Sequence, residues 1–585
     1  MPHRTSGRIS PLLAWGVVFA DIGTSVYYTP GILFNHPGIG ALAGTFVFMV
    51  AVAGSLLALK YVEITARFGD GGGVVSVATS AFGPLVGALG GMLITVDYFL
   101  TSSISSVSGV HYLASLLPIG GFEAAIACVS LVLLGLLNWV GIKESAIVSL
   151  VMALAGFAIQ VVVVGVTSLQ LTVADWRLVG EHLLAARAIE PRTLLFGFGA
   201  AWLAFSGLET LSQLSPAMRE PRQKTARAAM WLVVGAIIVT SPLLTAFSTT
   251  VLAGRMQGVP DADSFVSELG LAFGGLPLKI AVVASASALL IFAANTAIIG
   301  CYHVFLALVR GGFLPRALGA RSARFGTPHY AIITATLVPA AVVVLTGANL
   351  NLLGDMYAFG LLGAFALSSV SLDRLRWIER QRGPGFLLGV VITALVVLAW
   401  GANIYAKHLA TIFGTAVVLV GLGLAFAVRQ GWFARLTEVG FVSAEAAEAA
   451  ATEMPSARQI LTLVEAVDLQ PSYRAGTLLA VRGSNPRLIS EAAARARGTG
   501  EHAAYVLFVD EVPGVFYPPM LGPSDEALEV LNATCHALDE EGLTAIPVWR
   551  MAHDAGASIA AAAAKLDVSA VLIGAPRRTA LWHML

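Results

Sequence analysis

The chain has 585 residues, of which 57% are hydrophobic and only 12% are charged, and its formal net charge is zero. Soluble globular domains carry about 25% charged residues, so most of this chain must face lipid. The neutral balance argues against a nucleic-acid partner. The three cysteines are far apart and have no metal-binding spacing.

Apolar stretches near the 20 residues that a bilayer requires follow one another up to about residue 430. The first follows a short basic N-terminus without a small-residue cleavage site, so we interpret it as a span and not as a cleaved signal. We expect about twelve transmembrane helices, at 12–34, 41–61, 84–116, 123–142, 146–167, 192–214, 228–251, 277–303, 328–346, 350–371, 384–404 and 408–428.

Basic residues gather in three of the connections between these stretches, whereas the connections near 117–122 and 347–349 carry almost none. By the positive-inside rule, we expect the basic loops and both termini to be cytoplasmic. The basic residues are Arg219, Arg222, Lys224 and Arg227, then Arg310, Arg316, Arg321 and Arg324, and finally Arg374, Arg376, Arg380 and Arg382.

An acid and a glycine interrupt the first span near its centre, where residues 21–25 read Asp-Ile-Gly-Thr-Ser. A carboxylate at that depth costs roughly 2.5–3.5 kcal/mol on insertion scales. Glycine loosens the helix, and the hydroxyls of Thr24 and Ser25 can bond the freed backbone groups. The pattern predicts a broken helix with an ion or substrate site. The alternative is that Asp21 caps a helix at the membrane edge, which its central position disfavours.

A similar interruption occurs in the sixth span, where residues 205–210 read Phe-Ser-Gly-Leu-Glu-Thr. The offset of five spans is odd, so the second copy would be inverted, as in a 5+5 repeat. Paired discontinuous helices of this kind point to the midplane site of a transporter. If Asp21 and Glu209 line one chamber, one acid can hold a proton while the other faces a cation. The alternative for Glu209 is a hydrogen-bonded helix cap.

Other polar residues in or near the spans are expected to have structural roles. We interpret Asp97 mainly as a hydrogen-bonding residue between helices, with direct coordination of the ion as the alternative. Asn295 is interpreted as a hydrogen-bonding residue between helices as well. Glu63 and Arg67 precede the glycine-rich residues 69–73, and the whole segment is interpreted as a flexible inner loop.

The composition changes after residue 430, which divides the chain into a transporter domain (1–430), a helical cytoplasmic linker (431–470) and an α/β domain (471–585). Short apolar runs at 477–481, 504–509, 544–548 and 570–573 are typical of buried strands. Helical patterns at about 486–498, 524–541 and 555–566 alternate with them. This order predicts a small parallel sheet.

Residues 20–28, Ala-Asp-Ile-Gly-Thr-Ser-Val-Tyr-Tyr, resemble the first-span signature of the KUP family of K+ uptake permeases, Gly-Asp-Ile-Gly-Thr-Ser-Pro-Leu-Tyr. This family lies within the amino acid–polyamine–organocation superfamily. Residues 97–105, 205–209 and 356–360 resemble its third, sixth and tenth spans. The layout is similar to the KimA branch, which couples K+ import to protons and bears a universal-stress-protein-like cytoplasmic domain.

The resemblance implies a LeuT-like fold, a bacterial plasma-membrane location, K+ and H+ as the transported ions, and a homodimer paired through the cytoplasmic domain. K+ suits a cage of neutral oxygens with one nearby charge, and Thr101 and Ser105 share a helix face. The residues implied to surround the cation are Asp21, Tyr28, Thr101, Ser105, Ser206, Glu209 and Tyr357, with Glu209 and Asp21 in proton coupling.

The α/β domain resembles a fold that commonly binds adenine nucleotides through a Gly-x-x-Gly signature after its fourth strand. Here the second glycine is replaced by Arg577, so the usual backbone cradle is not expected. Arg577 and Arg578 either bind the phosphate of a regulatory nucleotide or form an ordinary basic turn. We expect no other cofactor. The chain stops at Leu585, before the family's last strand, which implies a strand from a partner or a truncated chain.

Two other functions stay open. An amino acid or organic-cation permease of the same superfamily is the first, although Asp21 would repel the carboxylate that such carriers bind at helix N-termini. A non-transporting sensor is the second. We expect no enzyme, because the membrane part has no Ser/His/Asp set, metal-ligand cluster or cofactor fingerprint.

Overall fold

The computed structural model describes residues 9–68, 73–141, 146–183, 189–255, 261–320, 322, 325–430, 460–468, 476–483, 485–511, 523–552 and 555–573. They fall into two compact units, one holding the described residues up to Gln430 and the other holding those after it. Each unit is described by itself.

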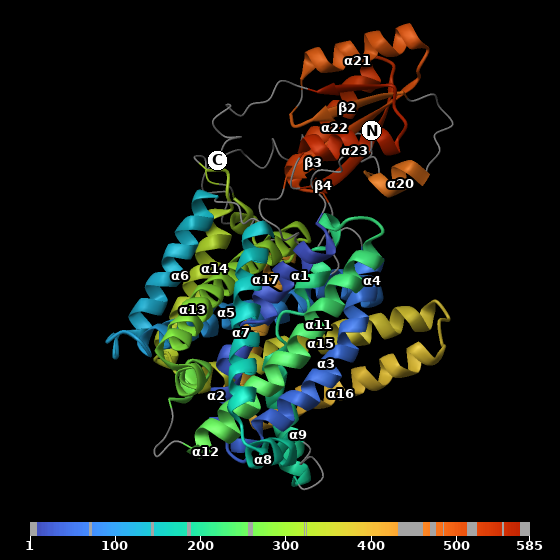
Figure 1. Ribbon diagram of the computed structural model, residues 1–585. Helices are drawn as coiled ribbons and strands as arrows, with labels where there is room; N and C mark the ends of the chain where they lie inside the picture. The colour runs from blue at the N-terminus through green and yellow to red at the C-terminus, as the bar shows by residue number, and fades with distance from the viewer. Residues whose placement is uncertain are drawn as a thin grey trace. The chain divides into compact units, whose positions relative to one another are not determined.

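The first unit is almost entirely helical (Figure 1). Its helices are α1 (Pro11–Ile22), α2 (Ser25–Asn35), α3 (Ala43–Arg67), α4 (Val74–Phe82), α5 (Pro84–Ala114), α6 (Glu123–Val140), α7 (Ala146–Gln170), α8 (Val173–Leu183), α9 (Pro191–Ala201), α10 (Thr210–Gln213), α11 (Arg222–Ala246), α12 (Ala253–Arg255), α13 (Phe265–Arg310), α14 (His329–Thr346), α15 (Leu350–Ile378), α16 (Pro384–Ala406) and α17 (His408–Arg429).

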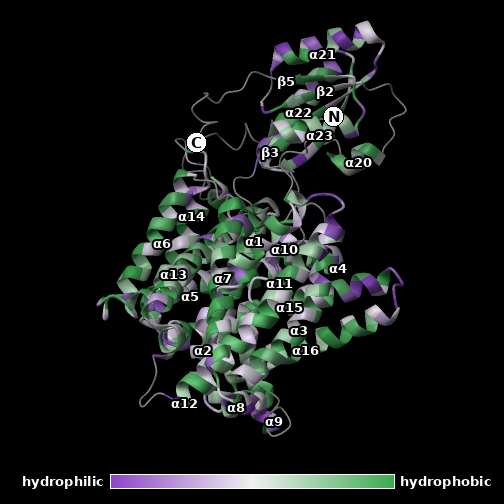
Figure 2. Cartoon of the chain, in the orientation of Figure 1, coloured by the Kyte–Doolittle hydropathy of each residue, from purple (hydrophilic) through white to green (hydrophobic). Residues whose placement is uncertain are grey.

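Twelve helical segments of the described residues are long and apolar enough to cross a membrane. This confirms the prediction of a mainly helical fold with about twelve spans, and the protein is a multi-pass membrane protein. Figure 2 shows apolar colour over most of the long helices of this unit.

The spans differ in how deeply they lie inside the unit. The first, third, sixth and tenth are 94%, 83%, 83% and 78% buried over their most apolar windows, whereas the fourth, fifth, eleventh and twelfth are only 28% buried. These four buried spans, formed by α1–α2, α5, α9–α10 and α15, also carry every predicted site residue of the membrane part. The predicted site therefore lies in the interior of the helical unit, while the outer spans face lipid.

Several helices differ from their predicted bounds, and α3 and α13 are two of them. Helix α3 continues to Arg67, six residues beyond the predicted end of the span, so the prediction of a flexible loop is wrong for Glu63 and Arg67. Residues 69–72 of the predicted loop lie outside the described residues. Helix α13 is longer than predicted and is kinked at Gly275, whose φ of 70° suits glycine. The prediction for Asn295 is confirmed, because it accepts a hydrogen bond of 2.7 Å from Asn138 of α6.

The second unit contains the predicted parallel sheet, with strands β1 (Leu461–Thr462), β2 (Thr477–Val481), β3 (Ala503–Glu511), β4 (Thr544–Ala552) and β5 (Ala570–Ile573) in the order β1-β4-β3-β2-β5. All the described pairs are parallel, and β2 is fully buried, which explains its continuous apolar run. The helices are α20 (Leu463–Asp468), α21 (Pro486–Thr499), α22 (Asp525–Glu540) and α23 (Ala555–Lys565).

The sheet begins earlier in the chain than the sequence pattern indicates. Strand β1 pairs with β4 through Leu461 and Thr462, which lie inside the range predicted as the linker. Two residues are too few to produce a recognisable alternation. Most of that predicted helical linker, and both Arg577 and Arg578, lie outside the described residues.

Candidate functional site

The first span is interrupted by a short turn. Helix α1 ends at Ile22 and α2 begins at Ser25, while Gly23 and Thr24 between them keep right-handed helical dihedrals. The hydroxyl of Thr24 donates to the carbonyl of Asp21 at 2.6 Å, and that of Ser25 donates to the carbonyl of Ile22 at 2.7 Å. As predicted, hydroxyl groups bond carbonyl groups at the interruption.

The sixth span is unwound more completely. After α9 and a short turn, Ser206 is extended and Gly207 has a φ of +99°, a conformation that L side chains rarely adopt. Glu209 directly precedes α10, but its side chain makes no capping hydrogen bond there. Its carboxyl group instead lies beside backbone N–H groups of the interruption itself, those of Gly207 and Glu209.

The two interruptions lie in direct contact. The hydroxyl of Thr210 donates to the carboxylate of Asp21 at 2.8 Å, and Ser25 donates to the carbonyl of Ala204 at 2.9 Å. A Cβ atom added to Gly207 would lie 2.9 Å from both Cγ and Oδ2 of Asp21. Only glycine at this position leaves room for the carboxylate. The carboxylate of Asp21 in the first interruption therefore packs directly against the backbone of the second interruption at Gly207.

Hydroxyl groups from the third and tenth spans also lie beside the two interruptions. Tyr357 of α15 accepts a hydrogen bond of 3.0 Å from Thr101 of α5 and also bonds the hydroxyl of Ser206. The phenol of Tyr28 is within hydrogen-bonding reach of Ser206 and Thr24. All of these side chains are buried. Neutral oxygens from four different spans thus meet at the interruptions.

Three carboxyl groups, Asp21, Asp97 and Glu209, are buried among these oxygens, and we call them the carboxyl cluster. Asp97 lies close enough to Asp21, and Glu209 close enough to both of them, for their charges to interact. Neither oxygen of Asp97 and only one of Glu209 finds a hydrogen bond of ordinary geometry, although the Tyr357 hydroxyl faces Asp97. Buried negative charge without a cation is costly, so this arrangement favours binding cations or protons.

Of the seven residues predicted around the cation, the described contacts connect all but one. Ser105 is buried one helical turn from Thr101, and its hydroxyl makes no hydrogen bond. Sequence reasoning missed the roles of Asp97, Gly207 and Thr210 here. Asp97, which we interpreted mainly as a hydrogen-bonding residue between helices, lies beside the other two acids and faces Tyr357 of α15.

No group of histidine, cysteine and acidic residues with the arrangement of a metal site occurs among the residues that the structure describes. The polar groups at the interruptions are instead hydroxyls, phenols and carboxyls, which are oxygen donors suited to a hard monovalent cation.

Comparisons with known proteins show what the whole chain is similar to. The family model for amino acid permeases matches residues 10–435. The chain is 26% identical over 432 residues to "Potassium transporter KimA" of Bacillus subtilis (strain 168), covering 72% of this chain and 69% of that protein.

Two plant proteins of Arabidopsis thaliana are also similar. "Cationic amino acid transporter 9, chloroplastic" is 24% identical over 330 residues, covering 51% of this chain and 54% of that protein. "Cationic amino acid transporter 4, vacuolar" is 22% identical over 407 residues, covering 66% and 65%. The chain thus spans less than two thirds of the length of either plant protein. The match over most of its length shows that the chain belongs to the amino acid permease family, within the amino acid–polyamine–organocation superfamily of transporters.

Proposed function

We propose that this transporter imports K+ together with protons, by alternating access at the interrupted first and sixth spans. The observation that carries the proposal is the carboxyl cluster: three buried acids lie together, and within the described part of the chain none of them forms an ion pair with a basic side chain. A cation that arrives with protons supplies the missing positive charge. The similarity to a protein named as a potassium transporter supports the same substrate.

The neutral oxygens suit K+ because this ion is large and weakly hydrated, and it exchanges its water shell for hydroxyl, phenol and carbonyl oxygens. In the proposed bound state, Tyr28, Thr101, Ser206 and Tyr357 turn oxygen lone pairs toward the ion, replacing the hydrogen bonds they now make with one another. Ser105 adds a hydroxyl from the same face of α5, and Asp21 provides the nearby negative charge.

The proton belongs to the same cluster. One K+ balances only one of three carboxylates, so at least one of the remaining acids is more stable when it carries a proton. Glu209 is the residue proposed to take it, with Asp21 as its partner in the exchange. Binding of K+ and protonation are then linked, because each changes the charge that the other meets.

A cationic amino acid is the second candidate, and the two plant relatives favour it. Its ammonium group would suit the acids, but its α-carboxylate would need free backbone N–H groups. At the first interruption the N–H of Gly23 donates to Phe19 O at 2.8 Å, and that of Thr24 donates to Asp21 O at 3.1 Å. The side-chain amide of Gln160 donates a hydrogen bond to the carbonyl of Gly23. These bonds, together with the nearby Asp21, disfavour a carboxylate and leave K+ as the better fit.

We further propose that the transporter lies in a bacterial plasma membrane with cytoplasmic termini, and that the C-terminal α/β domain regulates it as a universal-stress-protein-like module in a homodimer. In that domain β2 lies between β3 and β5, so the direction of the crossovers changes there. Such a switch point is the usual ligand crevice of an open parallel sheet. A regulatory nucleotide, with Arg577 and Arg578 as its contacts, would bind beside it.

Growth of a bacterium without its own K+ uptake systems tests the transport proposal. The wild-type chain is expected to restore growth at low K+, and the Asp21→Asn variant is expected to fail. Glu190→Gln is the control, because Glu190 is an exposed acid at the start of the sixth span, away from the carboxyl cluster, and makes no capping bond. Rescue by Asp21→Asn as well, or no rescue by the wild type, would contradict the proposal.

A further inference from the structure

A cavity of about 540 Å³ lies between α3, α11, α15 and α16, and no residue of the carboxyl cluster lines it. This volume falls within the range of roughly 300–1,000 Å³ that is typical of small-molecule sites. The proposed ion pathway does not use this cavity.

The walls of the cavity change from polar to apolar along the helices. On α11, Gln223 and Arg227 near the start of the helix are followed at four-residue intervals by Trp231, and then by Val234. These residues share one face of the helix. At 1.5 Å per residue, the polar and apolar ends of this face lie about 10–15 Å apart along the helix axis.

Helix α3 has its charged lining residues toward its end, and α16 lines the cavity with glycine and apolar residues. On α3 the order is reversed, with Arg67 at the end of the helix and Leu59 two turns deeper, and α16 starts beside the cavity at Gly385 and continues to Leu388 and Ile392. The polar end therefore lies where α3 ends and where α11 and α16 begin, which is one face of the membrane. A ligand with a polar head and an apolar tail matches such a cavity.

The apolar part of the cavity is open at the side. Trp231, Leu59 and Leu388 line it and are 61%, 44% and 43% exposed, although each belongs to a membrane span. Exposed apolar side chains on a span contact acyl chains. The occupant of this part of the cavity is therefore lipid, and not water or a soluble peptide.

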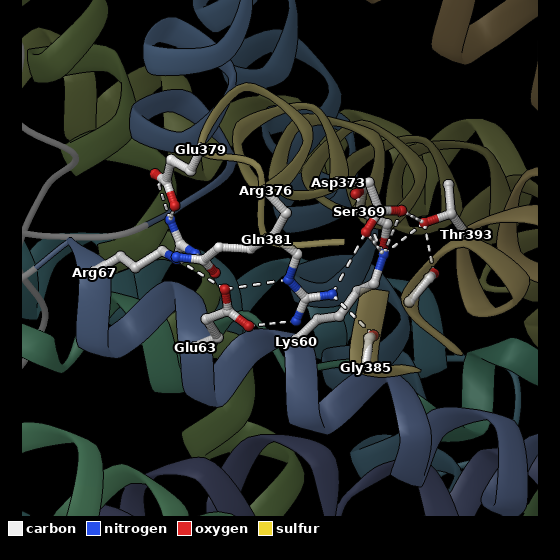
Figure 3. A network of polar contacts seen from close by, with 11 residues as sticks. Lys60, Glu63, Arg67, Ser369, Asp373, Arg376, Glu379, Gln381, Gly385 and Thr393 are labelled. Carbon is white, nitrogen blue, oxygen red and sulfur yellow. Dashed lines mark hydrogen bonds and ion pairs between the residues drawn. The ribbon is translucent and has the colours of Figure 1, made fainter. Parts of the chain in front are cut away.

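The polar end is positively charged, since four basic side chains and a single carboxylate line the cavity. Three of the basic groups are already paired. Lys60 bonds both oxygens of Asp373 at 2.8 Å, Arg67 bonds Glu379 at 2.7 Å, and Arg376 bonds Glu63 (Figure 3). These pairs form a fixed inner wall.

Arg227 is the fourth basic group, and it lies near the end of the cavity at an exposed position of α11. Among the residues that the structure describes, it has no ion pair. A guanidinium group with free donors matches the geometry of a phosphate.

We propose that this cavity binds an anionic phospholipid, with the headgroup phosphate on Arg227 and Gln223 and an acyl chain along Trp231, Leu59 and Leu388. Basic pockets between transmembrane helices are suited to such headgroups. A lipid in this place contacts α3, α11 and α16 at once, so it also stabilises their packing.

Binding to the purified full-length protein tests the proposal. Wild type, Arg227→Gln and Lys224→Gln would be examined by native mass spectrometry with phosphatidylglycerol and with phosphatidylcholine of the same acyl chains. Lys224 is the matched control, since it is exposed one turn earlier on α11 and does not line the cavity. The wild type is expected to retain phosphatidylglycerol in preference to phosphatidylcholine. Arg227→Gln is expected to weaken that binding about fivefold, the effect of one basic charge near a membrane surface, and Lys224→Gln to leave it unchanged.

A thermal-stability series with phosphatidylglycerol, phosphatidylcholine and glycerol phosphate separates a lipid from a soluble anion. Phosphatidylglycerol alone is expected to raise the melting temperature of the wild type. Equal binding of the two lipids, equal loss in Arg227→Gln and Lys224→Gln, or full protection by glycerol phosphate would each overturn the proposal.

Discussion

Two groups of charged residues in the helical unit differ in their charge balance. The first is the carboxyl cluster at the helix interruptions. The second, which we call the charge network, pairs three basic with three acidic side chains between α3 and α15: Lys60 with Asp373, Arg67 with Glu379 and Arg376 with Glu63. The charges of the network are paired with one another, so they need no further partner. The acids of the carboxyl cluster are not paired with any basic residue that the structure describes, so they need a cation or a proton from outside the protein.

The geometry of the charge network supports a structural role. The ammonium group of Lys60 bonds Asp373 of α15 and Thr393 of α16, so one side chain joins three helices. Thr393 also donates a hydrogen bond to Asp373, so it contacts both members of the ion pair. In the carboxyl cluster, by contrast, oxygens of Asp97 and Glu209 lack ordinary hydrogen bonds. The comparison predicts that changes in the network alter stability and that changes in the cluster alter transport.

The largest effect on stability is expected for Lys60→Met. Because the side chain of Lys60 is buried, removing its charge leaves Asp373 without its closest partner, which costs about 3 kcal/mol. Thermal or denaturant unfolding of the purified protein measures this loss. The double variant Lys60→Met with Asp373→Leu removes both charges and is expected to recover most of it. A single variant as stable as the wild type would mean that the pair does not join the helices.

A large loss of transport with little loss of fold is expected for Gly207→Ala. The added methyl group would clash with the carboxylate of Asp21, which is therefore displaced. The positive φ of residue 207 is also unfavourable for alanine. We expect K+ uptake to fall roughly 100-fold, the usual scale for misplacing a reacting group by about 1 Å. Gly235→Ala is the matched control, since a Cβ there meets nothing within 4 Å. Equal uptake by both variants would refute contact between the interruptions as a requirement for transport.

An intermediate effect is expected for Glu209→Gln, which keeps the shape of the side chain and removes its proton exchange. Uptake is expected to lose its dependence on external pH, because the residue proposed to carry the proton no longer titrates. Initial rates of K+ uptake, measured from acidic to alkaline pH, provide the readout. The wild-type pH profile in this variant would rule out Glu209 as the coupling residue.

The smallest effect is expected for Glu379→Gln at the exposed end of the charge network. This side chain is 41% exposed, and surface ion pairs contribute about 0–1 kcal/mol. We therefore expect unfolding to shift by less than 1 kcal/mol and transport to stay unchanged. A loss as large as that of Lys60→Met would mean that the network acts as one unit and not as separate pairs.

Much of the fold follows from sequence patterns. Apolar stretches predict the spans because a helix must have about 20 consecutive, mainly apolar residues to cross the lipid. The strands β2 to β5 were predicted within a few residues, because buried parallel strands form continuous apolar runs. The interruptions were predicted because an acid beside a glycine is rare and costly inside a span.

The charge network could not be predicted from local patterns. Lys60 and Asp373 are separated by 313 positions, and each looks like the end of an apolar stretch when it is considered alone. The charges of Glu63 and Arg67 indicated a loop, whereas partners on α15 allow the helix to continue through them. For the same reason, Asp97 was interpreted as structural, since only the fold brings it beside the two other acids.

K+ uptake into proteoliposomes tests the central claim, that the carboxyl cluster is a cation site, most directly. Purified wild type and Asp21→Asn would be reconstituted, and K+ and arginine fluxes would be measured with the internal pH under an imposed proton gradient. The account predicts K+ uptake accompanied by internal acidification in the wild type, little uptake in Asp21→Asn, and no arginine flux. Arginine uptake without K+ uptake, or full K+ uptake by Asp21→Asn, would contradict it.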